Sequence, residues 1–155
     1  MVVMTADWPV AEIDEVRRMR VLAAAIPGVS YAEEHFDASF DRVWEYIGDM
    51  ERSMPALVRL FREFRIVERE GEQLRARAVG WVGNRGTFDV VLRSGWCLMQ
   101  DRFAVGGFAA VPEGEGTRVA ACGGPRVPGG KAIGLLYGGD RGARRILRRL
   151  RSNLA

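Results

Sequence analysis

Only a few side chains in this sequence are placed where they could act on a bound molecule. The single histidine, His35, follows Glu34 in a short run that reads as a strand. If Phe36 points into the core, the alternation of side chains along the strand turns Glu34 inward and His35 outward. Glu34 is therefore the better candidate for an acid, a base or a hydrogen-bonding group, and Tyr46 offers a hydroxyl at the rim of the same space. Such isolated polar groups favour binding over catalysis, and we assign no catalytic residue.

Residue types suited to metal or phosphate chemistry are sparse. One histidine and two widely separated cysteines, Cys97 and Cys122, do not make a metal site, so we expect no metal and no other cofactor. The two cysteines are expected to be free, half-buried thiols. Residues 125–132, PRVPGGKA, resemble a phosphate-binding loop, but Pro125 replaces its first glycine and Ala132 replaces the hydroxyl residue that would hold Mg²⁺. We therefore do not assign phosphate binding to this run.

The positive charge of the chain is concentrated near its C-terminal end. The sequence has a formal net charge of +3, from 23 Lys and Arg against 20 Asp and Glu. Six arginines and no acidic residue fall within residues 141–155, so the rest of the chain is slightly acidic. Such a cluster either binds an anionic partner or forms a solvated helix face that suits the helix dipole. Nucleic-acid binding is not expected, because no aromatic or base-reading side chains alternate with these arginines.

Length and hydropathy predict a soluble, cytoplasmic protein with an ordinary hydrophobic core. A chain of 155 residues with 48% hydrophobic side chains can fold without disulfides or metals. The first nine residues do not resemble a secretory signal, and no run approaches the roughly 18 apolar residues that a membrane-spanning helix needs. We therefore expect no integral membrane association.

Apolar periodicity predicts helices at the start, near residue 45 and at the end of the chain, with strands between them. The first helix is expected from Asp7 to the stop at Pro27 and Gly28, and the second follows Ser39 and breaks near Met54 and Pro55. The last is expected over 132–154, with Asp140 capping a second segment within it. Turn residues bound the expected strands, which are 29–37, 61–69, 73–82, 87–93, 95–100, 102–111 and 117–122. This order is typical of an α+β fold with helices on one face of a meander sheet.

Small residues recur on the expected inner face of the sheet and on the last helix. Because packed interiors tolerate few voids, small residues that face one another mean either close backbone approach or an enclosed cavity. The bulky neighbours favour a cavity between the sheet and the last helix, with Glu34 or Tyr46 orienting a ligand. Its walls are expected to be Trp44, Ile47, Phe64, Ile66, Ala76, Ala78, Phe88, Val90, Leu92, Ile133, Leu136 and Tyr137.

Two stretches resemble a known superfamily. Residues 35–44, HFDASFDRVW, together with Asp49, are similar to the first strand and helix of START-like proteins, the SRPBCC superfamily that includes polyketide cyclases and Bet v 1-like proteins. Residues 111–119, VPEGEGTRV, resemble the penultimate hairpin of these proteins. The resemblance spans roughly residues 29–154. It implies a helix-grip fold, a curved antiparallel sheet wrapped around a long C-terminal helix, with a hydrophobic cavity for a lipid, sterol, polyketide or similar ligand.

These observations predict a helical extension over residues 1–28 and a START-like ligand-binding domain over 29–155. The extension packs against the outside of the domain or against a second subunit, which leaves a homodimer open. The predicted function is binding or transport of a hydrophobic or amphipathic small molecule. One alternative is an enzyme of the polyketide cyclase or aromatase type, and another is an adaptor that contacts a partner through the N-terminal helix or the arginine face.

Overall fold

The fold is built on one antiparallel sheet of seven strands, in the order β1-β7-β6-β5-β4-β3-β2. The computed structural model describes residues 13–130, 132 and 139–155. The strands are β1 (Ser30–Phe36), β2 (Glu63–Glu70), β3 (Gln73–Val79), β4 (Arg85–Arg93), β5 (Trp96–Gln100), β6 (Ala104–Glu113) and β7 (Gly116–Pro125). Six of them form a meander, and β1 joins it beside β7. The α+β prediction is confirmed.

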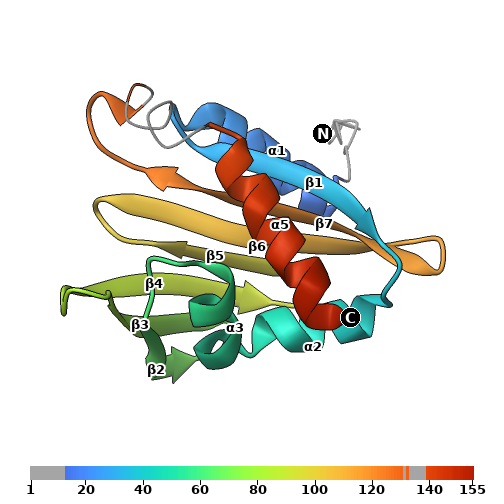
Figure 1. Ribbon diagram of the computed structural model, residues 1–155, viewed down its shortest axis with the longest axis horizontal. Coiled ribbons are helices and arrows are strands. Elements are labelled where there is room, and N and C mark those ends of the chain that lie inside the picture. The colour runs from blue at the N-terminus through green and yellow to red at the C-terminus, as the bar shows by residue number, and fades with distance from the viewer. Residues whose placement is uncertain (1–12, 131, 133–138) are drawn as a thin grey trace, which may run out of the picture.

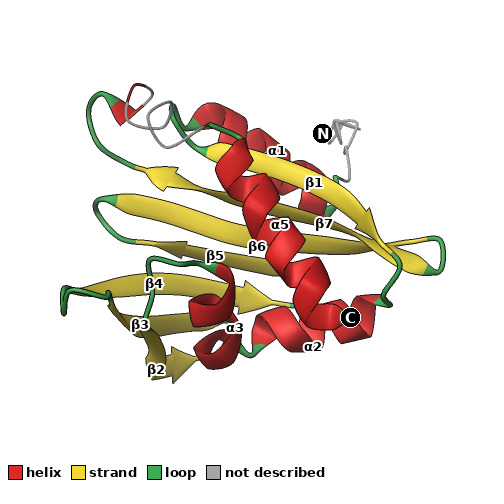
Figure 2. Cartoon of the chain, viewed as in Figure 1, coloured by secondary structure: helices red, strands yellow, loops and turns green. Residues whose placement is uncertain are grey.

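Helices cover both faces of the sheet. They are α1 (Glu15–Ala25), α2 (Phe40–Gly48), α3 (Met50–Leu57) and α5 (Arg141–Leu154). In Figure 1, α5 crosses the front of the sheet and α1 lies behind β1 and β7. We call the face toward α5 the inner face and the face toward α1 the outer face. Figure 2 shows α2 and α3 beside the strands at the β2 end of the sheet.

Each face of the sheet has its own hydrophobic core. On the inner face, buried side chains of α2, α3 and α5 pack with Phe36, Phe64 and Phe108 of the strands. On the outer face, Val16 and Met19 of α1 belong to a smaller cluster that also contains the following buried residues: Ala23, Trp96, Ala109, Ala120 and Cys122. The N-terminal helix therefore covers the outside of the sheet, which is one of the two positions that the sequence allowed.

The start of α1 differs from the sequence prediction. The expected N-cap, Asp7, lies outside the described residues. In the described part of the chain, α1 begins at Glu15, and the Asp14 carboxylate caps it by accepting the Arg17 N–H at 2.9 Å. The predicted stop is confirmed, because the helix ends at Ala25, just before Pro27 and Gly28.

Two predicted boundaries between elements are wrong. The second helix breaks at Asp49, where ψ is 71°, while Pro55 lies inside α3. The other error is the end of β3, which stops at Val79 because Gly80 turns the chain and its N–H donates to Asn84 O at 2.8 Å. A Cβ on Gly80 would lie 2.2 Å from Asn84 Oδ1, so a larger residue here would require the Asn84 side chain to move. Trp81 and Val82 consequently belong to the turn and not to the strand.

The last helix is held against β1 by side chains of both elements. Asp140 occupies the N-cap position of α5, but its carboxylate does not cap the helix, contrary to the prediction. It accepts the Tyr31 N–H at 3.1 Å, and Ser30 Oγ accepts the Ala143 N–H at 2.9 Å in its place. Toward the other end of α5, Arg151 donates to His35 O at 2.9 Å. Of the helix predicted over 132–154, residues 133–138 lie outside the described part.

The predicted alternation along the strands agrees with the structure. Ala32 and Phe36 are buried in the inner core, whereas Tyr31 packs against the outer cluster and His35 Nδ1 lies 2.7 Å from Glu113 Oε1.

The cysteines are free but fully buried, one in each core, so the half-buried prediction is wrong. Within the described residues, no helix has the length and apolarity needed to cross a bilayer.

Candidate functional site

The space between the sheet and the described part of α5 is occupied by side chains. Leu147 and Leu150 of α5 are fully buried in the same cluster as the strand residues below them. Several predicted cavity walls are packed in this core, namely Ile47, Phe64, Ala76 and Val90. None of the described residues of α5 lines either of the two pockets described below. Both pockets therefore lie away from the described part of α5, whereas the sequence predicted a cavity between the sheet and this helix.

The first pocket opens at the end of the sheet that carries the β3–β4 and β5–β6 turns, on the left in Figure 1. We call it the loop-end pocket, and its volume is about 460 Å³. It includes two of the predicted wall residues, Ala78 and Phe88. The full lining is Arg59, Leu60, Phe61, Ala78, Gly80, Trp81, Val82, Asn84, Arg85, Gly86, Phe88 and Asp101.

Two small residues account for the hollow. Ala78 and Gly86 are direct cross-strand partners in β3 and β4, so neither strand places a large side chain there. Next to them, Phe61 meets Phe88 edge to face with ring centroids 5.5 Å apart. Phe61 also packs against Phe64, at 5.4 Å. The result is a pocket with an aromatic wall next to two small residues.

The rim of the loop-end pocket is apolar and exposed. The exposed fractions are 76% for Leu60, 68% for Trp81 and 91% for Val82. Trp81 is fixed in place, because its Nε1–H donates to Arg59 O at 2.8 Å. Exposed apolar side chains that gather around a concave site are typical of binding surfaces. The sequence did not predict Trp81 and Val82 as pocket residues, because the apolar alternation extends the strand through them. The adjacent Gly80 and Gly83 are the residues that could have indicated a turn.

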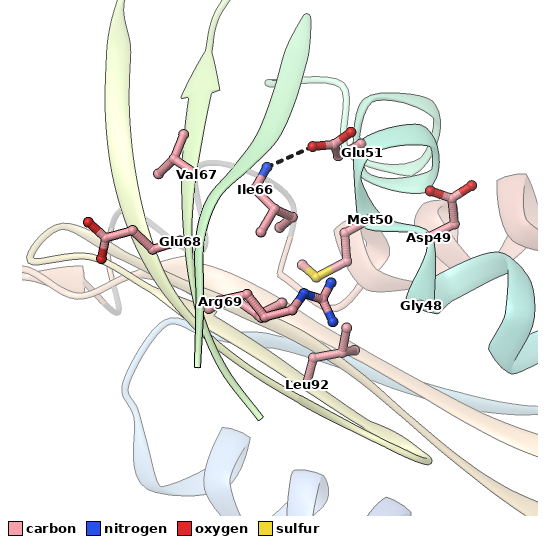
Figure 3. A pocket seen from close by; sticks show the side chains of 10 residues that line it. Gly48, Asp49, Met50, Glu51, Ile66, Val67, Glu68, Arg69 and Leu92 are labelled. Atoms are coloured by element: carbon pink, nitrogen blue, oxygen red, sulfur yellow. Dashed lines mark hydrogen bonds between the residues drawn. The ribbon is translucent and has the colours of Figure 1, made fainter. Parts of the chain in front are cut away.

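The second pocket is a cleft at the β2 edge of the sheet, which we call the edge cleft, and its volume is about 480 Å³ (Figure 3). It lies between the α2–α3 junction and β2 and includes the predicted residues Ile66 and Leu92. The Ile66 N–H donates to Glu51 Oε1 at 2.9 Å across it. The full lining is Gly48, Asp49, Met50, Glu51, Ile66, Val67, Glu68, Arg69, Leu74 and Leu92.

A β-bulge at Val67 turns the side chain of Arg69 toward the edge cleft. Ile66 pairs with Ala76 and Glu68 pairs with Arg75, so Val67 has no partner in β3. The extra residue reverses the alternation, and Arg69 pairs with Leu74 of the inner face. Figure 3 shows the Arg69 guanidinium beside Met50 and Leu92. The sequence alone did not indicate this bulge, so Arg69 was missed as a lining residue.

The remaining predicted site residues lie elsewhere. Glu34 faces the α5 side of the sheet as expected, but its carboxylate is 2.9 Å from the Arg151 guanidinium. Trp44 stacks on Phe40, and the Tyr46 hydroxyl accepts the Asn153 Nδ2–H at 2.9 Å. None of these side chains lines either pocket. Ile133, Leu136 and Tyr137 lie outside the described residues.

The outer face carries a charged network between α1 and β1. Arg20 Nε donates to Glu33 Oε2 at 3.1 Å, and the Tyr31 hydroxyl donates to the same carboxylate. Burial raises the pKa of Glu33, but the hydrogen bonds from Arg20 and Tyr31 and the charges of Arg20 and Arg118 outweigh it, so the net shift is downward. Burial, followed by the bond to Glu33, raises the pKa of Tyr31. This network joins α1 to the sheet and has no access to either pocket.

The sequence matches no protein-family model and no curated protein. Solved structures do match. The chain has the helix-grip fold of START-like proteins. Crystal structures of TTHA0849 from Thermus thermophilus and of the Zhui aromatase/cyclase from Streptomyces sp. R1128 are 24% and 15% identical to it, with TM-scores of 0.61 and 0.58. Each alignment covers 81% of this chain, and 96% and 93% of the respective neighbour.

A third helix-grip neighbour is the STAR-related lipid transfer protein from Xanthomonas axonopodis. It is 12% identical, with a TM-score of 0.59, and the alignment covers 80% of this chain and 84% of that one. The resemblance to START-like proteins therefore extends to the fold, and the predicted helix-grip fold is confirmed. Identities this low establish the architecture, and the activity of this chain must be argued from its own residues.

Proposed function

We propose that this helix-grip protein binds a hydrophobic or amphipathic small molecule in the loop-end pocket. The observation that carries the proposal is the hollow at Ala78 and Gly86, walled by Phe61 and Phe88. A volume of about 460 Å³ falls in the range of small-molecule sites. Burial of a ligand's apolar surface there would contribute about 25 cal/mol per Å².

The residues around the pocket support binding more than catalysis. Asp101 is the one acidic residue among the described lining residues, and its Oδ1 already accepts the N–H groups of Phe103 and Ala104 at 2.8 and 2.7 Å. The acid considered for an enzymatic role, Glu34, is paired with Arg151 away from the pocket. The names of two structural neighbours refer to lipid transfer and to aromatase/cyclase activity, and the lining of this pocket favours the first kind of role.

Filling the hollow tests the proposal. The neutral dye N-phenyl-1-naphthylamine should become fluorescent on binding the wild-type protein. Ala78→Phe and Gly86→Val should each weaken this binding about tenfold or more, because their side chains would occupy the ligand's volume. A Cβ on Gly86 meets its neighbours at ordinary distances of 3.8 and 3.9 Å, so the first carbon of valine fits at that position.

The matched control is Ala24→Phe, which adds the same ring at an exposed position of α1. It should leave dye binding unchanged. Circular dichroism and urea unfolding would verify that each variant is folded. Wild-type protein that binds no apolar probe, or pocket variants that bind the dye as well as wild type, would refute the proposal.

A further inference from the structure

Three arginines lie close enough to influence one another, and one of them lines the loop-end pocket. Arg59 lines the pocket and follows α3. Arg149 reaches from α5 to the same segment, where its Nη1–H donates to Leu57 O at 2.7 Å. Arg145 lies one helical turn before Arg149 on the same side of α5. We call Arg59, Arg145 and Arg149 the arginine cluster.

Within the described part of the chain, no acidic side chain forms an ion pair with the arginine cluster. None of the ion pairs found among residues 13–130, 132 and 139–155 involves Arg59, Arg145 or Arg149. Partial burial lowers the pKa of Arg149, and the positive charges of Arg59 and Arg145 lower it further. Like charges held together without an acid favour the approach of an anion.

Other arginines of α5 show that this arrangement is local. Arg151 lies 2.9 Å from Glu34 and also donates to His35 O, so its charge is compensated within the fold. Arg144 and Arg148 are exposed on α5 and flank Arg145 and Arg149 in the sequence without contributing to the pKa shift of Arg149. The helix therefore offers a matched pair of arginines of equal charge outside the cluster.

We propose that the ligand is an anionic amphiphile, whose apolar part occupies the loop-end pocket and whose carboxylate or phosphate contacts the arginine cluster. This inference rests on the function proposed above and adds the chemical class of the ligand. The apolar wall of Phe61 and Phe88 suits a hydrocarbon chain or ring, and guanidinium groups bind carboxylate and phosphate through charge-assisted hydrogen bonds. Arg59 belongs to both parts of the site, which places the head group at the pocket mouth.

Displacement of N-phenyl-1-naphthylamine measures this preference directly. Dodecanoate, dodecyl phosphate and dodecan-1-ol share one chain length and differ in the head group. At low salt, both anions should displace the dye at concentrations about tenfold lower than the alcohol, since charge-assisted hydrogen bonds are the stronger kind. Raising the salt concentration should narrow the difference, because the arginines are partly exposed.

Two double variants test whether the arginine cluster causes the preference for anionic amphiphiles. Arg145→Gln with Arg149→Gln should reduce the preference for anions to about twofold or less, while Arg144→Gln with Arg148→Gln should retain it. The single variant Arg145→Gln should weaken the preference without removing the bond between Arg149 and Leu57. Unchanged affinity for the neutral dye would show that the pocket of each variant is intact.

The outcomes separate the two proposals. If the alcohol and the anions displace the dye equally, or if both double variants lose the preference to the same extent, the assignment of the head group to the cluster is wrong while the binding function stands. If neither the dye nor any of the three amphiphiles binds, the loop-end pocket is not a binding site and both proposals fail.

Discussion

At the scale of single residues, the placement of small and charged side chains decides where this helix-grip protein is hollow. Ala76 and Ala78 are equally small and lie on the same face of β3. Ala76 pairs with Phe88 and is fully buried, whereas Ala78 pairs with Gly86 and borders the loop-end pocket. The sequence showed that small residues recur, but the partner of each one depends on the strand register, which only the structure gives.

Glu33 is expected to make stability depend on acid. Its folded pKa is lowered from 4.5, so the stabilisation is present above about pH 4.5 and is lost as the pH falls through the folded value. Urea unfolding between about pH 6 and pH 3 should show a smaller loss of stability in Glu33→Gln than in wild type. Glu115→Gln, at an exposed turn, is the control and should follow wild type. Equal slopes for all three proteins would contradict the proposed role of the Arg20–Glu33–Tyr31 network.

The thiols of Cys97 and Cys122 are expected to be inert in the folded protein. Burial raises the pKa of each to about 12, and neither side chain has access to solvent. At pH 8, a thiol reagent such as Ellman's reagent should modify neither cysteine in the native protein and both in guanidinium chloride. Ser152→Cys, at an exposed position of α5, should react at once in the native state. Rapid native labelling of either natural cysteine would show that its core opens readily.

At the scale of elements, the contacts that fix α5 come from a strand distant in sequence. Ser30 of β1 caps the helix by accepting the Ala143 N–H, while Asp140 at the N-cap position binds β1. A sequence pattern can identify a capping residue next to a helix, but it does not reveal a cap that comes from more than 100 residues away. The bulge at Val67 is a similar case, because it is defined by pairing with β3.

Ser30→Ala is expected to destabilise the protein by about 1 kcal/mol, the usual cost of a lost N-cap. The physical reason is that the Ala143 N–H would be left without its partner. Urea denaturation measures the change. Ser39→Ala removes a local cap, from the Arg42 N–H of α2, and should have an effect of similar size. A change below about 0.3 kcal/mol for Ser30→Ala alone would show that water replaces this cap at no net cost.

At the scale of the whole molecule, the sheet is covered on both sides. The meander of consecutive strands, the inward face of most strands and the two terminal helices could be predicted, because they follow from apolar periodicity and turn residues, whereas the pairing of β1 with β7 could not. The location of the pockets could not be predicted, because it depends on which side chains of α2, α3 and α5 pack against the inner face of the sheet. The predicted walls were divided among the core, the loop-end pocket and the edge cleft.

The outer core is expected to make α1 a structural part of the molecule. Met19 is completely buried between α1 and the sheet, so Met19→Ala should cost about 2–5 kcal/mol in urea unfolding. Val21 is 63% exposed on the same helix, and Val21→Ala should change stability by less than about 0.5 kcal/mol. Residues 29–155 alone should also be less stable than the full chain. A stable, monomeric fragment would instead support the independence of residues 29–155.

On both edge strands of the sheet, β1 and β2, some backbone groups are already hydrogen-bonded to side chains. Asp140 and Arg151 bind the Tyr31 N–H and the His35 carbonyl of β1, and Glu51 binds the Ile66 N–H of β2 next to the bulge. Pairing with a strand of another molecule would first have to break these bonds. These bonds therefore disfavour association of two copies by continuation of the sheet, and they oppose growth into fibrils for the same reason.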